Sequence, residues 1–388
     1  MWPKINFNRY LFIEILLGLA LGTGHLTSLR FTGKVGTSEI LFLLLVLILS
    51  VRYLKNILTF NYSFESYLRI FLFATIFIVA PIMTSAVYLL TDYNSSPKYL
   101  ISMGINIFLV FLLIEARKDG FSYKNATLWF FIVYSTLHFI TLFIYPFESV
   151  RYPYVYTGGA NNPNQIVWYS QSLSLLLAVF YKKFSLFFIP VLVFLTMQVN
   201  SDAYLMSIIL SGLIYAFFHF FYIRHLSVGK NLLIFIVPIS IISLLFISTY
   251  SAELELFWRA AGGYVRWDLF TNASHVISTS PIVGYGVGSF SGKTFPFEGT
   301  EAHSNIFDLG TQFGIFFTIV IYFVMLKAVY VAVSRHDFFV AAFMIAFIIV
   351  GLFHYTARHF IFWVEFSMFY YYAFYSNNTK QLLLNKTE

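Results

Sequence analysis

Long runs of apolar residues restrict what this chain can fold into more than any other feature. A helix that crosses a bilayer keeps its backbone polar groups in internal hydrogen bonds over about 20 apolar residues. The runs are continuous rather than alternating with a period of two, so they predict helices and not strands. Twelve spans are predicted, at residues 9–27, 38–54, 66–90, 97–116, 126–145, 165–181, 184–200, 203–222, 231–249, 306–327, 337–354 and 359–376.

The composition places the chain in the same class. Hydrophobic residues make up 59% of the chain and charged residues only 11%, whereas soluble domains are about half apolar and about a quarter charged. The first run, 9–27, lacks a small-residue cleavage site, so we expect an uncleaved signal-anchor. No soluble domain, low-complexity tract or obvious repeat interrupts the pattern. The sequence therefore predicts an all-α, polytopic membrane protein with a single domain over residues 1–388.

The basic residues predict the orientation of the spans. With the N-terminus in the cytoplasm, the inner loops and tails carry sixteen of the 24 Lys and Arg residues, a bias typical of the positive-inside rule. Residues 251–305, between the ninth and tenth spans, then form a long outer loop, periplasmic in a Gram-negative host. The net charge of +7 reflects this topology, and we expect no nucleic-acid partner. The outer basic residues are Arg30, Lys34, Lys98, Arg151, Arg259, Arg266, Lys293 and Arg358.

Cysteine and acidic residues limit the chemistry. The absence of cysteine excludes disulfides, thiolate metal ligands and a cysteine nucleophile. Neither a DxD nor an HExxH motif occurs, and we expect no metal and no cofactor. Glu14 and Glu365 fall inside predicted spans, where a charge is costly; a function and structural pairing between helices explain them equally well. The outer acids, which show no ligand spacing, are Asp92, Glu148, Glu253, Glu255, Glu298 and Glu301.

Two arginines of the 251–305 loop suit phosphate binding. Arg259 and Arg266 lie seven residues apart, about two turns if the segment is helical, although Gly262-Gly263 interrupts it. The rigid guanidinium fork donates two parallel hydrogen bonds to a phosphate. The alternative is an interfacial arginine that contacts lipid phosphates or snorkels.

A short amphipathic helix is predicted directly after Arg266. Leu269, Ala273 and Val276 fall near one stripe at helical spacing. We expect this helix to lie on the membrane surface.

His303 is the candidate base of the same loop. An unperturbed histidine titrates near pH 6.5, so it can take a proton from a hydroxyl and return it. The alternative is an ordinary histidine at a membrane boundary, because several others occur near predicted boundaries. Two cations and one titratable base together suit a reaction in which a diphosphate leaves and a hydroxyl attacks.

Two further outer segments carry candidate ligand-binding residues. Between the fifth and sixth spans these are Arg151, Tyr154, Asn161, Asn162 and Asn164. Their side chains suit hydrogen bonds to a polar ligand, although Asn, Gly and Pro also mark a compact loop for backbone reasons. Between the seventh and eighth spans, Asp202 either caps the following helix or binds sugar hydroxyls.

Three segments and one glycine together resemble the O-antigen ligase/polymerase superfamily. They are Arg266-Trp267-Asp268-Leu269-Phe270, Pro281-Ile282-Val283-Gly284-Tyr285-Gly286, Ala302-His303-Ser304-Asn305, and Gly314. Members commonly show an arginine with an aromatic residue four positions later, a Pro-x-x-Gly-x-Gly run, and an Ala-His-Asn-like helix start followed by glycine. The stretch Gly158–Asn164 resembles the family's earlier Asn-Pro-Asn loop. The layout, about twelve helices with a long periplasmic loop between the ninth and tenth, is also similar.

The resemblance implies a GT-C-like glycosyltransferase architecture in the bacterial inner membrane, with the active site facing the periplasm. Arg266 would hold the diphosphate of an undecaprenyl-linked glycan, and His303 would activate an acceptor hydroxyl. Arg259 is expected as a second phosphate contact and Asn305 as a substrate contact. Neither a metal nor a nucleotide sugar is implied, so charge complementarity would carry catalysis. The implied partners are undecaprenyl-diphosphate-linked oligosaccharide, membrane lipid and a polysaccharide chain-length regulator.

The sequence leaves three functions open. A polymerase, which transfers the growing chain onto the next lipid-linked repeat unit, is preferred because the chain is short and fits the motifs loosely. A ligase would transfer finished polymer to lipid A-core. A flippase or transporter for lipid-linked sugars usually shows paired halves and polar residues at the midplane, which this chain lacks. The chain departs from the family pattern in Ser201-Asp202-Ala203 where Ser-Arg-Gly is usual, in Phe270 where Trp is usual, and in Ser304 between His303 and Asn305.

Overall fold

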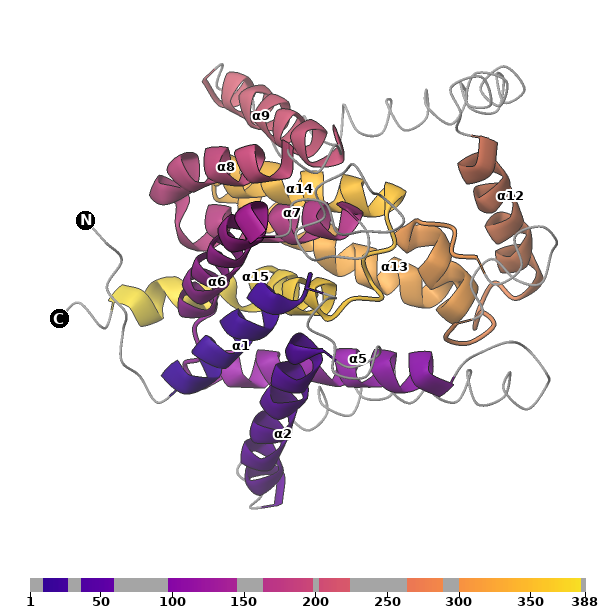
Figure 1. Ribbon diagram of the computed structural model, residues 1–388, viewed down its shortest axis with the longest axis horizontal. Helices are drawn as coiled ribbons and strands as arrows, with labels where there is room; N and C mark the ends of the chain where they lie inside the picture. The colour runs from indigo at the N-terminus through magenta and orange to yellow at the C-terminus, as the bar shows by residue number, and fades with distance from the viewer. Residues whose placement is uncertain are drawn as a thin grey trace.

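The computed structural model describes residues 10–26, 36–58, 97–144, 163–197, 202–223, 264–288 and 300–384. All regular elements in these ranges are helices, as the sequence predicts (Figure 1). They are α1 (Leu11–Thr23), α2 (Thr37–Leu58), α5 (Pro97–Lys118), α6 (Tyr123–Ile144), α7 (Pro163–Phe180), α8 (Lys182–Met197), α9 (Asp202–Ile223), α12 (Tyr264–Thr279), α13 (Asn305–Ser334), α14 (Phe338–Phe353) and α15 (Phe360–Leu384).

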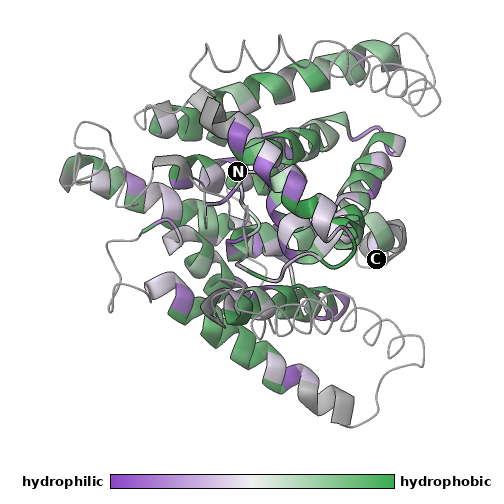
Figure 2. Cartoon of the chain, turned by 90° about the vertical axis from the view of Figure 1, so that its right-hand side faces the viewer, coloured by the Kyte–Doolittle hydropathy of each residue, from purple (hydrophilic) through white to green (hydrophobic). Residues whose placement is uncertain are grey.

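Ten of the twelve predicted spans coincide with these helices, and the other two, 66–90 and 231–249, lie outside the described residues. By length and composition, α5, α6, α9 and α13 suffice to cross a membrane. Apolar residues also dominate α1, α7 and α14, which are shorter. Figure 2 shows hydrophobic residues along most of the helices, with hydrophilic residues scattered among them. A helical membrane protein is supported, and the number of crossings stays a prediction.

The predicted helix after Arg266 is confirmed as α12. Leu269, Ala273 and Val276 are all buried, as the stripe at helical spacing requires. This face packs against α13, and at Gly310 of α13 the two helices come so close that a β-carbon would lie 2.8 Å from Ile277. The position of α12 on a membrane surface stays a prediction.

The helices form one packed bundle. α1 packs on α6, α14 packs on α9, and α15 lies against both α5 and α13. Large aromatic side chains fill the interior, among them Trp363, Phe366 and Phe130, each fully buried. Hydrogen bonds between helices add to this packing, such as Tyr123 to Ser367 at 2.7 Å. The buried core therefore fixes the positions of the helix ends, where the loops meet.

Glu14, one of the two acidic residues in predicted spans, has a structural role. Its carboxylate accepts hydrogen bonds from the backbone amide of Ser122 and from Nδ2 of Asn125, both at 2.6 Å. These bonds tie α1 to the start of α6. The second residue, Glu365, is fully buried in α15.

Loops predicted for the same side of the membrane meet at the same end of the bundle. At one end Lys182 contacts Asp337 at 2.6 Å, and the Tyr10 hydroxyl donates to Asp119 at 3.2 Å. At the other end Glu301 contacts Arg358. In Figure 1, α12 lies at the right end of the long axis and the last turns of α15 lie at the left. The alternation of predicted inner and outer loops thus agrees with the fold.

Candidate functional site

The loop that carries His303 is shaped by a single buried carboxylate. Asp308, in the first turn of α13, accepts hydrogen bonds from the backbone amides of Ala302 and Ser304, each at 2.9 Å. These two amides flank His303 and turn it into the left-handed region, at φ 58°. The His303 side chain is directed outward and is 48% exposed. Because a side chain rarely adopts this backbone conformation, the loop is built to present this residue.

A second histidine with the same backbone angle shows the contrast. His336, also at φ 58°, follows the other end of α13. Its amide bonds to the carbonyl of Val333, and the next amide, of Asp337, bonds to Ala332. This is the Schellman pattern, in which a left-handed residue ordinarily ends a helix. Among the described residues these are the two non-glycine positions with positive φ, and helix termination explains only His336.

An ion pair fixes the His303 loop to the connection between α14 and α15. Nη1 of Arg358 donates to both carboxylate oxygens of Glu301, at 2.5 and 2.6 Å. Oε2 of Glu301 lies 3.8 Å from Nδ1 of His303. That distance is too long for a hydrogen bond, but a nearby carboxylate favours the charged form of an imidazole. The Glu301 carboxylate therefore lies between a candidate base, His303, and a cation, Arg358.

Arg358 is held on two further sides. Its Nε donates to Nε2 of His359 at 3.0 Å, so that His359 nitrogen acts as an acceptor. Its guanidinium also lies over the ring of Trp168, 5.4 Å from the centroid, in the range of cation–π attraction. Trp168 belongs to the first turns of α7, directly after the predicted Asn-Pro-Asn loop. Arg358 thus joins α7 to the His303 loop through Glu301.

The Pro281–Gly286 run docks on a break in α13. Gly314 interrupts the helix at φ 82° and ψ 171°. Around the break the amides of Tyr285 and Gly286 donate to Thr311 and Gln312 at 2.8 and 2.9 Å, and the amide of Ile315 donates to Pro281 at 2.7 Å. A β-carbon at Gly314 would lie 2.1 Å from the carbonyl oxygen of Ile282. The two glycine motifs are therefore one interlocked structure.

Phe270 links α12 to the same region. Its ring stacks on Phe307 with centroids 4.8 Å apart. Phe307 lies in the first turn of α13, four residues after His303, and Phe270 lies four residues after Arg266. The aromatic position of the motif thus brings the helix of Arg266 beside the helix of His303.

Asn305 is buried and bonded within the protein. Its Oδ1 accepts from the amides of Thr356 and Ala357 at 2.8 and 3.0 Å, and its Nδ2 donates to the Thr356 hydroxyl at 2.8 Å. It holds the α14–α15 connection, which carries Arg358. Its predicted contact with a substrate stays a prediction.

The remaining predicted site residues have less structural context. Arg266, Asn164 and Asp202 belong to the first turns of α12, α7 and α9. Arg151, Tyr154, Asn161, Asn162 and Arg259 lie outside the described residues. The structure places His303 and Asn305 at the start of α13 and the two glycine motifs farther along the same helix. Around His303 it adds Glu301, Asp308, Trp168 and Arg358.

Sequence reasoning missed these four additions for clear reasons. Glu301 and Arg358 appeared only as outer charges, because their pairing spans 57 residues. Asp308 is an acidic residue just inside a predicted span, which was the available signal. Trp168 resembled any aromatic residue at a membrane boundary.

An apolar groove of about 230 Å³ opens between α12 and α13. Ile277, Ile306, Gly310 and Ile319 line it, among others. It extends along α13 from Ile306, near the His303 loop, toward the middle of that helix. In the described parts of the chain, no three His, Asp or Glu side chains are grouped as a metal site would need.

Comparison with models of known protein families gives no match, and no curated protein sequence matches the chain significantly. The resemblance to the O-antigen ligase/polymerase superfamily rests on the motifs and on the predicted layout of the spans. The contacts among those motifs are properties of this structure and do not depend on the resemblance.

Proposed function

We propose that the protein is a glycosyltransferase of the bacterial inner membrane, an O-antigen polymerase that works at the periplasmic face. It transfers a growing glycan from undecaprenyl diphosphate to a hydroxyl of the next lipid-linked repeat unit. The reaction uses no metal or nucleotide sugar, as the resemblance implies. A polysaccharide chain-length regulator is the expected protein partner.

One observation carries this proposal. The Pro281–Gly286 run docks on the Gly314 break of α13, and the same helix begins at the exposed His303. Motif segments that are separate in the sequence are therefore both attached to the N-terminal third of α13. A loop that only joins two helices has no need to hold a histidine in a left-handed conformation.

In the proposed reaction His303 removes the proton of the acceptor hydroxyl. The hydroxyl oxygen forms a bond to the anomeric carbon, while the bond from that carbon to the diphosphate oxygen breaks. The electron pair leaves with the diphosphate, which remains on the lipid. Glu301, 3.8 Å from Nδ1, stabilises the imidazolium that forms, as opposite charges within about 4–6 Å do.

The cations have different roles in this scheme. Arg266 and Arg259 hold the departing diphosphate, because charge stabilisation of a leaving anion is a large catalytic contribution. Arg358 is neutralised by Glu301 and positions the His303 loop. The groove between α12 and α13, about 230 Å³ in volume, receives the first part of the polyprenyl chain.

The test is a cell that lacks the gene and carries either the wild-type chain or a variant. Surface polysaccharide is resolved on a gel. We expect a single repeat unit on lipid A-core without the gene and with His303→Ala, and a full ladder with His336→Ala, the matched histidine at the other end of α13. Bare core with polymer retained on undecaprenyl diphosphate would identify a ligase. Bare core with unflipped precursor would identify a transporter.

A further inference from the structure

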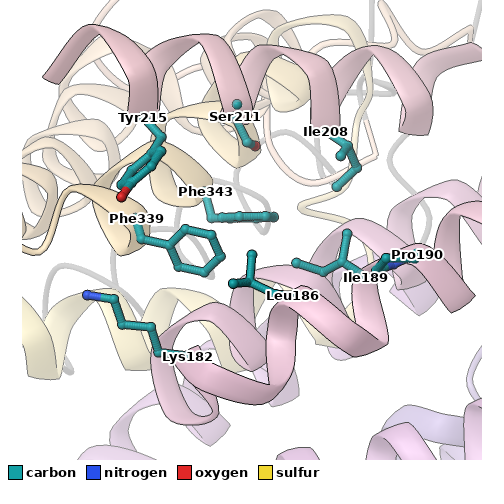
Figure 3. Close-up of a pocket in the computed structure, with 10 residues that line it drawn as sticks. Lys182, Leu186, Ile189, Pro190, Ile208, Ser211, Tyr215, Phe339 and Phe343 are labelled. Carbon is teal, nitrogen blue, oxygen red and sulfur yellow. The ribbon is translucent and has the colours of Figure 1, made fainter. Parts of the chain in front are cut away.

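A second groove lies at the opposite end of the bundle from His303, between α8, α9 and α14 (Figure 3). Its volume is about 430 Å³, within the range of about 300–1,000 Å³ usual for small-molecule sites. Its lining residues are Lys182, Leu186, Ile189, Pro190, Ile208, Ser211, Gly212, Tyr215, Phe339 and Phe343. Leu186 is 69% exposed, so the groove opens to the surface of the bundle.

Lys182 and Tyr215 lie at one end of this groove, and the hydroxyl of Ser211, which lies between its ends, donates to the Ser207 carbonyl of its own helix (Figure 3). Figure 3 shows the Lys182 amine and the Tyr215 hydroxyl on the same side of the cavity, with Ile208 and Pro190 toward the other. Lys182 is the first residue of α8 and is followed by Lys183. From Lys182 to Pro190 the helix rises about 12 Å. The groove therefore has a cationic mouth and an apolar floor. These features are complementary to the charged headgroup and the acyl chain of an anionic lipid.

Lys182 is positioned to take a second anion. Its ammonium donates to Oδ1 of Asp337 at 2.6 Å, and both side chains are partly exposed. An ammonium has three donors, and the described residues take one of them. A phosphate at the mouth can use the others or displace the carboxylate, because exposed ion pairs of this kind are weak.

We propose that this groove binds one acyl chain of an anionic phospholipid, with the lipid phosphate at Lys182. The lipid comes from the leaflet that borders the basic end of the bundle. A transmembrane helix is a poorer fit, because an apolar helix offers no anion to the partly exposed Lys182 ammonium. The proposal does not depend on the reaction at His303.

The test compares lipids that remain bound to the purified protein. The protein is placed in nanodiscs of equal phosphatidylglycerol and phosphatidylethanolamine and then released for native mass spectrometry. We expect wild type to retain phosphatidylglycerol preferentially. Gly212→Leu fills the groove, since no atom lies within 4 Å of a β-carbon there, and it should abolish the preference. Gly104→Leu, on α5 with equally open surroundings, is the matched control and should keep it.

Two charge variants separate lipid binding from a structural role of the ion pair. Lys182→Gln should lower phosphatidylglycerol retention about fivefold, the factor expected for one basic residue at an anionic headgroup. Asp337→Asn frees the ammonium and should raise retention. If the pair were only structural, both variants would change retention in the same direction. Equal retention of the two lipids by wild type, or a co-purifying protein displaced by Gly212→Leu, would overturn the proposal.

Discussion

Arg358 donates hydrogen bonds to both carboxylate oxygens of Glu301, at 2.5 and 2.6 Å, and thereby joins the α14–α15 connection to the loop that presents His303. The same carboxylate lies 3.8 Å from His303. The negative charge of Glu301 therefore lies beside both His303 and Arg358, although Arg358 is 57 residues away from Glu301 in the sequence. If His303 is the base, this pair sets both its position and its electrostatic surroundings.

Glu301→Gln should reduce the rate of polymerisation about tenfold or more, because hydrogen bonds to charged groups contribute about 1.5–3 kcal/mol. The variant also removes the anion that stabilises a protonated His303. The rate of chain extension in membranes carrying equal amounts of protein measures this. Glu298→Gln, an acid of the same loop in the sequence, should leave the rate unchanged. Equal losses in both variants would contradict a specific role for Glu301.

Gly314→Ala should destabilise the protein by about 3 kcal/mol or more, because a left-handed alanine and a forced contact each cost about 1–3 kcal/mol. The new β-carbon would lie 2.1 Å from the Ile282 carbonyl oxygen. Thermal unfolding in detergent measures the loss. Gly104→Ala, with open space around it, should be neutral or slightly stabilising. An unfolding temperature near wild type for Gly314→Ala would contradict the interlocked arrangement.

Asp308→Asn should loosen the His303 loop. An amide side chain offers one acceptor oxygen where the carboxylate offers two, so one of the amides of Ala302 and Ser304 loses its partner. A buried donor without a partner costs about 1–3 kcal/mol. Hydrogen exchange of residues 302–304 should accelerate. Asp337→Asn is the control, because the Asp337 side chain makes no capping bond to α14. Unchanged exchange in Asp308→Asn would show that other contacts hold the loop.

Tyr355 gives a pH dependence of stability. Burial, and next the carboxylates Asp308 and Glu301, raise the pKa of Tyr355 well above its usual value. Above about pH 10 the unfolded chain loses this proton while the folded chain keeps it, so the free energy of unfolding falls as the pH rises. Tyr355→Phe should flatten that fall, measured by chemical unfolding between neutral pH and pH 11. Tyr330→Phe, at an exposed tyrosine, is the comparison and should keep the wild-type slope.

The fold was largely predictable because membrane helices follow apolar runs. The span at 337–354 matches α14 closely, and the span at 306–327 begins with α13 but ends seven residues before it does. The stripe of Leu269, Ala273 and Val276 predicted α12 and its buried face. Such periodicity reports local environment directly.

The site was only partly predictable, because its contacts join distant segments. His303 and the glycine motifs were found from their local pattern. Glu301 and Arg358 were not, since a charge in a loop carries no mark of its partner. Nothing in the sequence indicated that the buried amide of Asn305 bonds to Thr356, and its contact with a substrate stays a prediction. The structural roles of Glu301, Arg358 and Asn305 depend on partners that are distant in the sequence.

Chain extension by the purified protein in lipid vesicles would show whether His303 is the base of a polymerase. The substrate is an undecaprenyl-diphosphate-linked repeat unit, and wild type is compared with His303→Gln and His336→Gln. We expect long polymer from wild type and His336→Gln, and unextended repeat units from His303→Gln at equal folded protein. Polymer of wild-type length from His303→Gln would contradict the assignment of the base, and no extension by wild type would contradict the polymerase itself.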